Sequence, residues 1–238
     1  MNDVETAHGT DPSDAGGPAA THDPVPMVID WLIGILTGIV GLLITALGIS
    51  LYSRVDRAMI ADAVDAEATE LEGITRADFI TAAEPFLDWF AAGIAVTGLV
   101  ALGAAAVFVY KRRGTRARVA SKGGTTATFW ACAVYGAVVT VLVSFIPGSA
   151  AAGGGAAAYL HDGASGTRLG AVSGLVGAAL TVPLVVFVSI GLLAGASAIG
   201  QAGGAVVLLG ILVVGTALAM ALNAGLGALG GYLATRFT

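Results

Sequence analysis

Charged side chains are nearly absent from the second half of this chain. Between Gly123 and Thr235 the only Asp, Glu, Lys, Arg or His residues are His161, Asp162 and Arg168. A soluble domain carries about a quarter charged residues, because most of its polar groups face water. The whole chain has only 11% charged residues against 56% hydrophobic ones. This composition excludes an ordinary soluble domain and places the C-terminal half in lipid.

Lysine and cysteine are also scarce. The chain has two lysines against nine arginines, and fifteen of its sixteen acidic residues precede residue 89. An acidic, lysine-poor composition fits a salt-adapted organism, and a GC-rich genome is the plain alternative. The single cysteine, Cys132, excludes an intramolecular disulfide. We interpret it as a small residue that faces lipid or a neighbouring helix.

Motifs that carry chemistry are missing as well. The sequence contains no nucleophile elbow, phosphate-binding loop, zinc motif or dinucleotide-binding fingerprint. His161 and Asp162 are an adjacent acid–base pair, but the glycines and serine that follow them are typical of a turn. The sequence therefore predicts no catalytic, cofactor-binding or metal-ligating residues and a protein that is not an enzyme.

Long hydrophobic runs predict an all-α fold, a polytopic bundle of about six membrane-spanning helices. One span needs about 20 apolar residues. The fourth expected span has only 13 residues and is rich in glycine, so a re-entrant segment is the alternative to a crossing there. Pro183 is expected to kink the fifth span. The expected spans are residues 27–52, 86–110, 128–145, 148–160, 169–197 and 203–234.

Composition divides the chain into three parts. Residues 1–25 form a polar, acidic tail without Lys or Arg, which we expect to be disordered. Residues 26–127 contain two spans with an acidic connection between them, where Thr75 and Asp78 resemble a capping box that starts a helix. Residues 128–238 form a glycine-rich membrane domain with four segments.

Glycines recur at helical spacing in several spans. Without a side chain, two membrane helices approach each other closely, so we expect these glycines to face another helix. The same contacts are suited to packing within one chain or to a homo-oligomer. On this interpretation, Gly38→Leu weakens the fold or an assembly. The expected helix-packing residues are Gly34, Gly38, Gly41, Gly48, Gly170, Gly174, Gly227 and Gly231.

Six positive charges follow the second span, with no acidic residue among them. Such a stretch stays in the cytoplasm, so we expect a multi-pass protein of the cell membrane with a cytoplasmic N-terminus and an external segment 53–85. Anionic lipids are expected partners of these charges. Nucleic acid is not, because no aromatic residues are interleaved. The six residues are Lys111, Arg112, Arg113, Arg116, Arg118 and Lys122.

The C-terminal half resembles a known family. A span ends at Ser144-Phe145-Ile146-Pro147-Gly148 and leads into a Gly/Ala block that closes with Tyr159-Leu160. The next span opens at residues 169–175, and residues 227–233 close the domain. With these features, roughly residues 128–234 resemble an uncharacterised family of glycine-rich membrane domains widespread in halophilic archaea. The resemblance implies a source and a four-segment layout, and it implies no activity.

Two functions remain open from the sequence, and a third, a lipid-interacting membrane enzyme, lacks a visible catalytic pair. The polar residues within the spans are few, and Asn223 is the one that we consider for a polar path or for hydrogen bonds between helices. The sequence favours a structural or accessory membrane protein without catalysis. The alternative is a small channel or transporter for a neutral solute, with Asn223 and the kink at Pro183 near its path.

The expected topology is tested by cysteine labelling of intact cells. A cysteine placed at Ala66, in the acidic segment, should react with an impermeant maleimide added from outside. A cysteine placed at Thr115, among the positive charges, should stay unlabelled until the membrane is opened. The reverse pattern would contradict this orientation.

Overall fold

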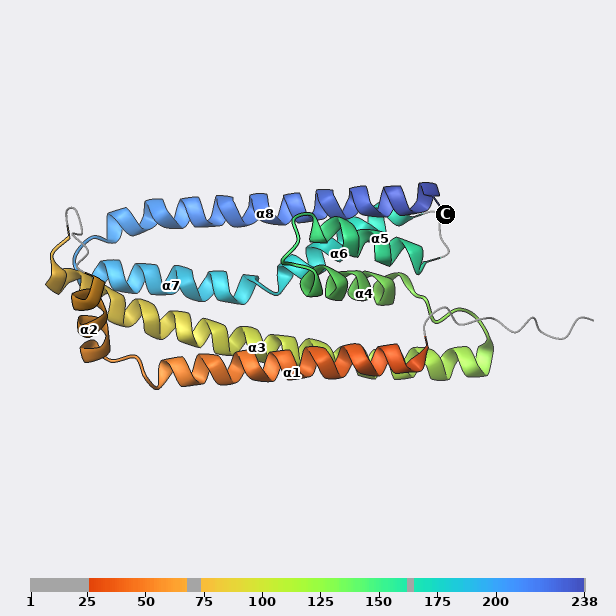
Figure 1. Cartoon of the computed structure of the whole chain (residues 1–238), viewed down its shortest axis with the longest axis horizontal. Helices are drawn as coiled ribbons and strands as arrows, with labels where there is room; N and C mark the ends of the chain where they lie inside the picture. Colours follow the sequence, from red (N-terminus) through yellow and green to blue (C-terminus); the bar gives the residue numbers. More distant parts are fainter. Residues whose placement is uncertain (1–25, 68–73, 162–164, 238) are drawn as a thin grey trace, which may run out of the picture.

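The chain forms an elongated bundle of helices, shown as a computed structural model in Figure 1. The structure describes residues 26–67, 74–161 and 165–237. Within these ranges there are eight helices and no strand, which confirms the all-α prediction. The predicted disorder of residues 1–25 lies outside the described residues.

The helices differ widely in length. The longest, α3, has 47 residues, and the shortest two, α2 and α5, have 11 each. Their bounds are α1 Met27–Tyr52, α2 Arg57–Glu67, α3 Arg76–Lys122, α4 Phe129–Leu142, α5 Ser149–Tyr159, α6 Gly166–Ala179, α7 Val182–Ala198 and α8 Ala202–Phe237.

Four helices run along the long axis, and three short ones gather at one end. In Figure 1, α1, α3, α7 and α8 extend toward the end that carries α2. The short helices α4, α5 and α6 lie at the opposite end, with the start of α1 and the C-terminus. The main contacts join α1 to α3, α3 to α7, and both α5 and α6 to α8. Helices α1 and α3 form an N-terminal hairpin, and α3 joins this hairpin to α7 and the helices that follow it in the bundle.

The start of α3 follows from the predicted capping box. Thr75 is the N-cap, and its hydroxyl accepts a hydrogen bond from the main-chain N–H of Asp78 at 3.2 Å. The same hydroxyl donates to the Asp78 carboxylate at 2.7 Å. The helix then continues to Lys122, so the six basic residues that follow the expected second span belong to the same helix. Arg and Lys form helices well, and positive charges near a C-terminus stabilise the helix dipole.

The prediction of about six spans is not confirmed. Among the described residues, α1, α3 and α8 are long and apolar enough to cross a membrane, and α6 with α7 makes a fourth span if the bent pair counts as one. Helices α4 and α5 have 14 and 11 residues. At about 1.5 Å per residue, neither reaches across a hydrocarbon core of roughly 30 Å.

Helices α4 and α5 instead form a short antiparallel hairpin. A Cβ on Gly136 of α4 would overlap the carbonyl oxygen of Gly153 of α5. Nearer the open end of the hairpin, the Cys132 thiol lies 3.6 Å from the carbonyl oxygen of Leu160. Gly148 starts α5 with a φ of 88°, a left-handed conformation that favours glycine at this tight reversal.

The kink predicted at Pro183 is present. Helices α6 and α7 meet at 40°, with the break at Leu180 and Thr181. Pro183 lies in the first turn of α7. Its ring cannot donate the hydrogen bond that would continue α6, and it collides with the carbonyl of the residue four places earlier. The expected span 169–197 is therefore two helices.

The glycines of α1 do not all contact α3. A Cβ on Gly41 or Gly48 would meet the main chain of α3, and one on Gly34 would overlap the Val109 side chain. Gly38 differs, because a Cβ there would meet nothing within 4 Å. At about 3.6 residues per turn, Gly38 lies at the margin of the stripe rather than at its centre. It faces a groove between α1 and α3 that is described below.

The glycines of α6 and α8 lie against each other. A Cβ on Gly227 would overlap the carbonyl oxygen of Gly170, and one on Gly174 would overlap that of Asn223. Gly231 has the same relation to Gly166. The helices meet through their main chains here, with no room for any side chain.

Substitutions at two glycines of α8 should show whether stability depends on the position of a glycine or only on the number of glycines. Gly227→Leu should lower the free energy of unfolding by about 3 kcal/mol, because the added atoms collide with main chain that cannot move alone. Gly225→Leu should change little, since a Cβ there meets nothing within 4 Å. Thermal unfolding in detergent measures both. Equal melting temperatures would contradict the packing shown.

Candidate functional site

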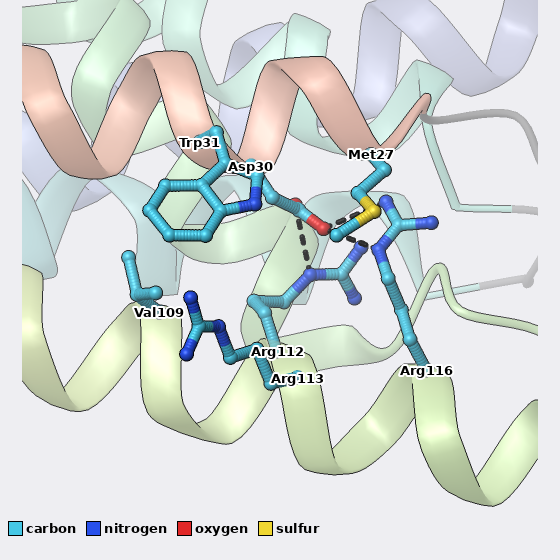
Figure 2. Close-up of a pocket in the computed structure, with 7 residues that line it drawn as sticks. All are labelled: Met27, Asp30, Trp31, Val109, Arg112, Arg113 and Arg116. Carbon is cyan, nitrogen blue, oxygen red and sulfur yellow. Dashed lines mark hydrogen bonds and ion pairs between the residues drawn. The ribbon is translucent and has the colours of Figure 1, made fainter.

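A buried cluster of charged residues lies where the start of α1 meets the end of α3. Asp30 is 5% exposed and Arg112 is 4% exposed. The Arg112 Nε donates to Asp30 Oδ1 at 2.9 Å, and the Arg116 Nε donates to Asp30 Oδ2 at 2.6 Å (Figure 2). One carboxylate therefore binds two guanidinium groups on successive turns of α3.

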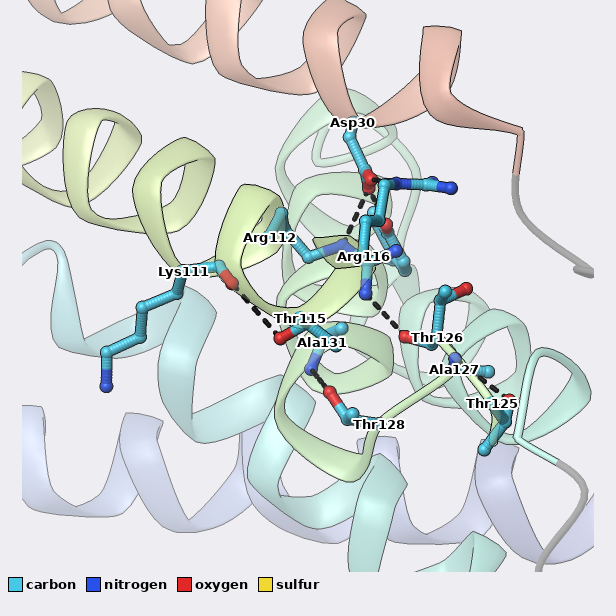
Figure 3. Close-up of polar contacts among 11 residues, drawn as sticks. Asp30, Lys111, Arg112, Thr115, Arg116, Thr125, Thr126, Ala127, Thr128 and Ala131 are labelled. Atoms are coloured by element: carbon cyan, nitrogen blue, oxygen red, sulfur yellow. Dashed lines mark hydrogen bonds and ion pairs between the residues drawn. The ribbon is translucent and has the colours of Figure 1, made fainter. Parts of the chain in front are cut away.

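The same cluster reaches the beginning of the C-terminal domain. The hydroxyl of Tyr135, on α4, donates to Asp30 Oδ1. The Arg112 Nη1 donates to the carbonyl oxygen of Thr126, in the segment before α4 (Figure 3). Phe108 of α3 packs edge-on against the Tyr135 ring at 5.8 Å. The cluster thus ties α1, α3 and α4 together at one end of the bundle.

The sequence builds this cluster from simple local rules. Asp30 is in the first turn of α1, where the positive end of the helix dipole stabilises a carboxylate. Arg112 and Arg116 are four residues apart, so their side chains share a face of α3. The antiparallel packing of α1 on α3, visible in Figure 1, brings that face to Asp30.

The described residues of the cluster carry more positive than negative charge. Two arginines face one carboxylate, and the Arg112 Nη2 is buried without a hydrogen-bond partner among the described residues. A buried donor that lacks a partner is costly. The arrangement can therefore hold three helices together and also attract an anion to this end of the protein.

The six predicted basic residues have different surroundings. Arg112 and Arg116 bind Asp30, as described. The guanidinium of Arg113 lies over the Trp31 ring, 4.6 Å from its centre. Lys111, Arg118 and Lys122 are exposed. The structure therefore brings three of the six together around the start of α1.

A groove follows α1 and α3 away from this cluster. Its volume is about 410 Å³, and it is lined by Trp31 and Arg113 at one end and by Gly34, Gly38, Leu102 and Ala106 among others. A second pocket, of about 10 Å³, adjoins it and includes Asp30, Arg112 and Arg116. Trp31, Val109 and Arg113 line both (Figure 2).

Beyond this end, the chain continues into the glycine-packed helices α4 to α8. Residues 130–237 match the model of DUF5518, a family of unknown function. This DUF5518 segment begins at α4 and ends at the last residue of α8, close to the extent of the expected resemblance to an uncharacterised domain. Asp30, Arg112 and the groove lie outside it. No curated protein and no solved structure matches the chain.

Asn223 lies inside the DUF5518 segment but bonds to its own helix. Its Nδ2 donates to the carbonyl oxygen of Ala219 at 2.9 Å. Its main-chain oxygen lies against Gly174 of α6. Neither of the two pockets described above includes it. The predicted polar path through Asn223 is therefore not formed by those pockets.

Of the acid–base pair His161 and Asp162, the structure describes only His161. His161 Nδ1 lies 3.1 Å from the carbonyl oxygen of Ala127, and its ring packs edge-on against Phe129. Asp162 lies outside the described residues. Within the described part of the chain, no three His, Cys, Asp or Glu side chains are grouped to hold a metal ion.

Removing the central carboxylate should destabilise the protein strongly. Asp30→Asn leaves Arg112 buried without its counter-charge, which should lower the free energy of unfolding by about 3 kcal/mol. Asp62→Asn, which changes an exposed carboxylate on α2, is the matched control and should be neutral. Thermal unfolding of both variants in detergent tests this. A wild-type melting temperature for Asp30→Asn would show that the cluster contributes no net stability.

Proposed function

We propose that this chain is a structural or accessory protein of the cell membrane and has no enzymatic activity. The observation that supports this best concerns the polar side chains within the helices. Each of four donates to a carbonyl oxygen four residues earlier in its own helix, at 2.7 to 3.0 Å. They are Thr140, Ser189, Thr216 and Asn223. A solute path or a reaction would use such groups, whereas here they serve the helices that carry them.

The packing of the DUF5518 segment supports the same proposal. Main-chain contacts between α5, α6 and α8 leave no space for a solute between these helices. Gly154 and Gly170 both lie against the carbonyl of Gly227. Close packing of this kind makes a rigid membrane domain rather than a carrier with moving parts.

Charge at the two ends supports a topology with four crossings. The start of α6, which carries Arg168, and the end of α8, which carries Arg236, lie at the same end as the basic part of α3 (Figure 1). Asp62, Asp78 and Glu84 lie toward the other end, with α2 and the start of α3. The positive-inside rule then places both chain termini in the cytoplasm, with the α4–α5 hairpin entering from that side and returning to it. The acidic, lysine-poor composition supports a halophilic source.

The turn between α4 and α5 supports self-association. Residues 143–148 lie one 14-residue helix away from the basic end, about 21 Å into the membrane. Phe145 is 81% exposed there. Non-helical main chain at this depth is stable only where protein or water covers it. A homo-oligomer in which a second copy covers this turn meets that requirement.

A small channel for a neutral solute is the second candidate, and one observation favours it. The turn at 143–148 lies at the same level as the break between α6 and α7, since Thr140 and Gly177 are neighbours. Helices that end near the middle of the membrane surround the binding sites of many transporters. Thr181 and Ser144 are the hydroxyl residues at this level.

Solute flux into liposomes separates the two candidates. Liposomes that contain the protein should take up glycerol and urea at the rate of protein-free liposomes. Uptake that rises with the amount of protein and falls in Thr181→Val would overturn the structural proposal and support the channel. Thr181→Val keeps the shape of the side chain and removes its hydroxyl, so its melting temperature should stay close to that of the wild type.

A further inference from the structure

The groove between α1 and α3 combines an apolar floor with a cationic end. Gly34, Gly38 and Ala106 contribute no long side chains to it, so hydrocarbon surface of both helices is exposed along its length. Arg113 and Trp31 close the end that lies beside the charged cluster. Tryptophan and arginine are typical of the level at which lipid headgroups meet the hydrocarbon.

Gly38 lies on the floor of the groove. On one side of it, Gly34 packs against Val109, and on the other, Gly41 packs against the main chain of Gly98. Between these contacts, a Cβ on Gly38 would meet nothing within 4 Å. The two helices are therefore in contact on both sides of a recess, and a large side chain at position 38 would fill it.

Among the described residues, positive charge predominates at the charged end of the groove. Arg112, Arg113 and Arg116 lie there with one described carboxylate, Asp30. Asp30 already binds two of them, while Arg113 is exposed and stacks on Trp31. The buried Arg112 Nη2, which has no hydrogen-bond partner in the described part of the chain, adds to the positive field. An anionic group beside Arg113 would be stabilised by all three guanidinium groups.

We propose that this groove binds one anionic phospholipid of the surrounding membrane. Its phosphate lies beside Arg113 and Trp31, and one of its hydrocarbon chains lies along Gly38 and Ala106. The volume of about 410 Å³ is in the range of about 300–1,000 Å³ typical of small-molecule sites. This lipid site is independent of the proposed structural role and of the DUF5518 segment.

Lipid binding to the full chain tests the proposal. The protein is purified in a neutral detergent, stripped of lipid, and titrated with phosphatidylglycerol or phosphatidylcholine while native mass spectrometry counts the bound molecules. One phosphatidylglycerol should bind about tenfold more tightly than phosphatidylcholine. Both lipids carry the phosphate, but the positive choline group of phosphatidylcholine is repelled by the guanidinium groups. Inorganic phosphate should not compete at the same concentration, since it cannot use the apolar groove.

Two pairs of variants locate the site. Arg113→Gln should weaken phosphatidylglycerol binding about tenfold, and Arg118→Gln, an exposed arginine on the same helix, should not. Gly38→Leu fills the groove and should abolish binding of the first lipid molecule. Gly103→Leu, where a Cβ also meets nothing within 4 Å, is its control. If Gly38→Leu does not fold, Ala106→Leu fills the same groove from α3.

The outcomes that overturn the proposal are distinct. Equal affinity for the two lipids would contradict a site for anionic lipid. An equal loss of phosphatidylglycerol affinity in Arg113→Gln and Arg118→Gln would show that the basic residues attract lipid without forming a specific site. If Gly38→Leu folds and binds the lipid as the wild type does, the hydrocarbon chain of the lipid does not lie in the groove. Displacement of the lipid by inorganic phosphate would show a free-anion site. None of these results bears on the flux assay that tests the proposed function.

Discussion

Contacts between glycine main chains hold the membrane-embedded half of this protein together. Lipid is as apolar as a leucine side chain, so burial of apolar surface gives membrane helices little reason to associate. Close packing has to supply the energy, and it requires that atoms meet at van der Waals distance along whole helix faces. Gly227 of α8 meets Gly154 of α5 and Gly170 of α6 at one point. The position of α5 and α6, and of the hairpin formed with α4, depends on that point.

A different interaction holds the N-terminal hairpin in place. Asp30 contacts two arginines of α3 and a tyrosine of α4, so a single carboxylate joins α1 and α3 to the DUF5518 segment. Buried charges are expensive, and they are strong only when their partners are fixed. Here the partners are fixed by the close approach of α1 and α3 at Gly41 and Gly48. Packing therefore positions the charges, and the charges set the register of the two helices.

The features that the sequence predicted are those with a local cause. The start of α3 depends on Thr75 and Asp78, which are three residues apart, and the bend after α6 depends on Pro183 alone. The glycine pairs of α6 and α8 need only helical spacing to share a face. A prediction that uses neighbouring residues is reliable when neighbouring residues determine the structure.

The features that the sequence did not predict depend on distance or depth. The sequence predicts the end of one span at residue 145 and the start of the next at 148, but it also predicts a full crossing for residues 128–145. Residues 143–145 continue the apolar run, so hydropathy does not reveal that α4 already ends at Leu142. Asp30 and Arg112 are 82 positions apart, and an acid near the start of a span gave the only signal. Gly38 has the same helical spacing as the other glycines of α1, yet it faces a groove. The sequence of one helix does not determine how far a second helix lies from each of its residues.

The α4–α5 hairpin is synthesised before the helix against which it packs. Alanine and glycine make up all of α5 except its terminal Ser149 and Tyr159, so it has little tendency of its own to enter lipid. Its partner α8 is synthesised after it, with α6 and α7 between them. Until Gly230 arrives to pack against Ala151, the hairpin lacks the surface that it rests on. The hairpin can therefore take its final position only after α8, more than 40 residues further along the chain, has been made.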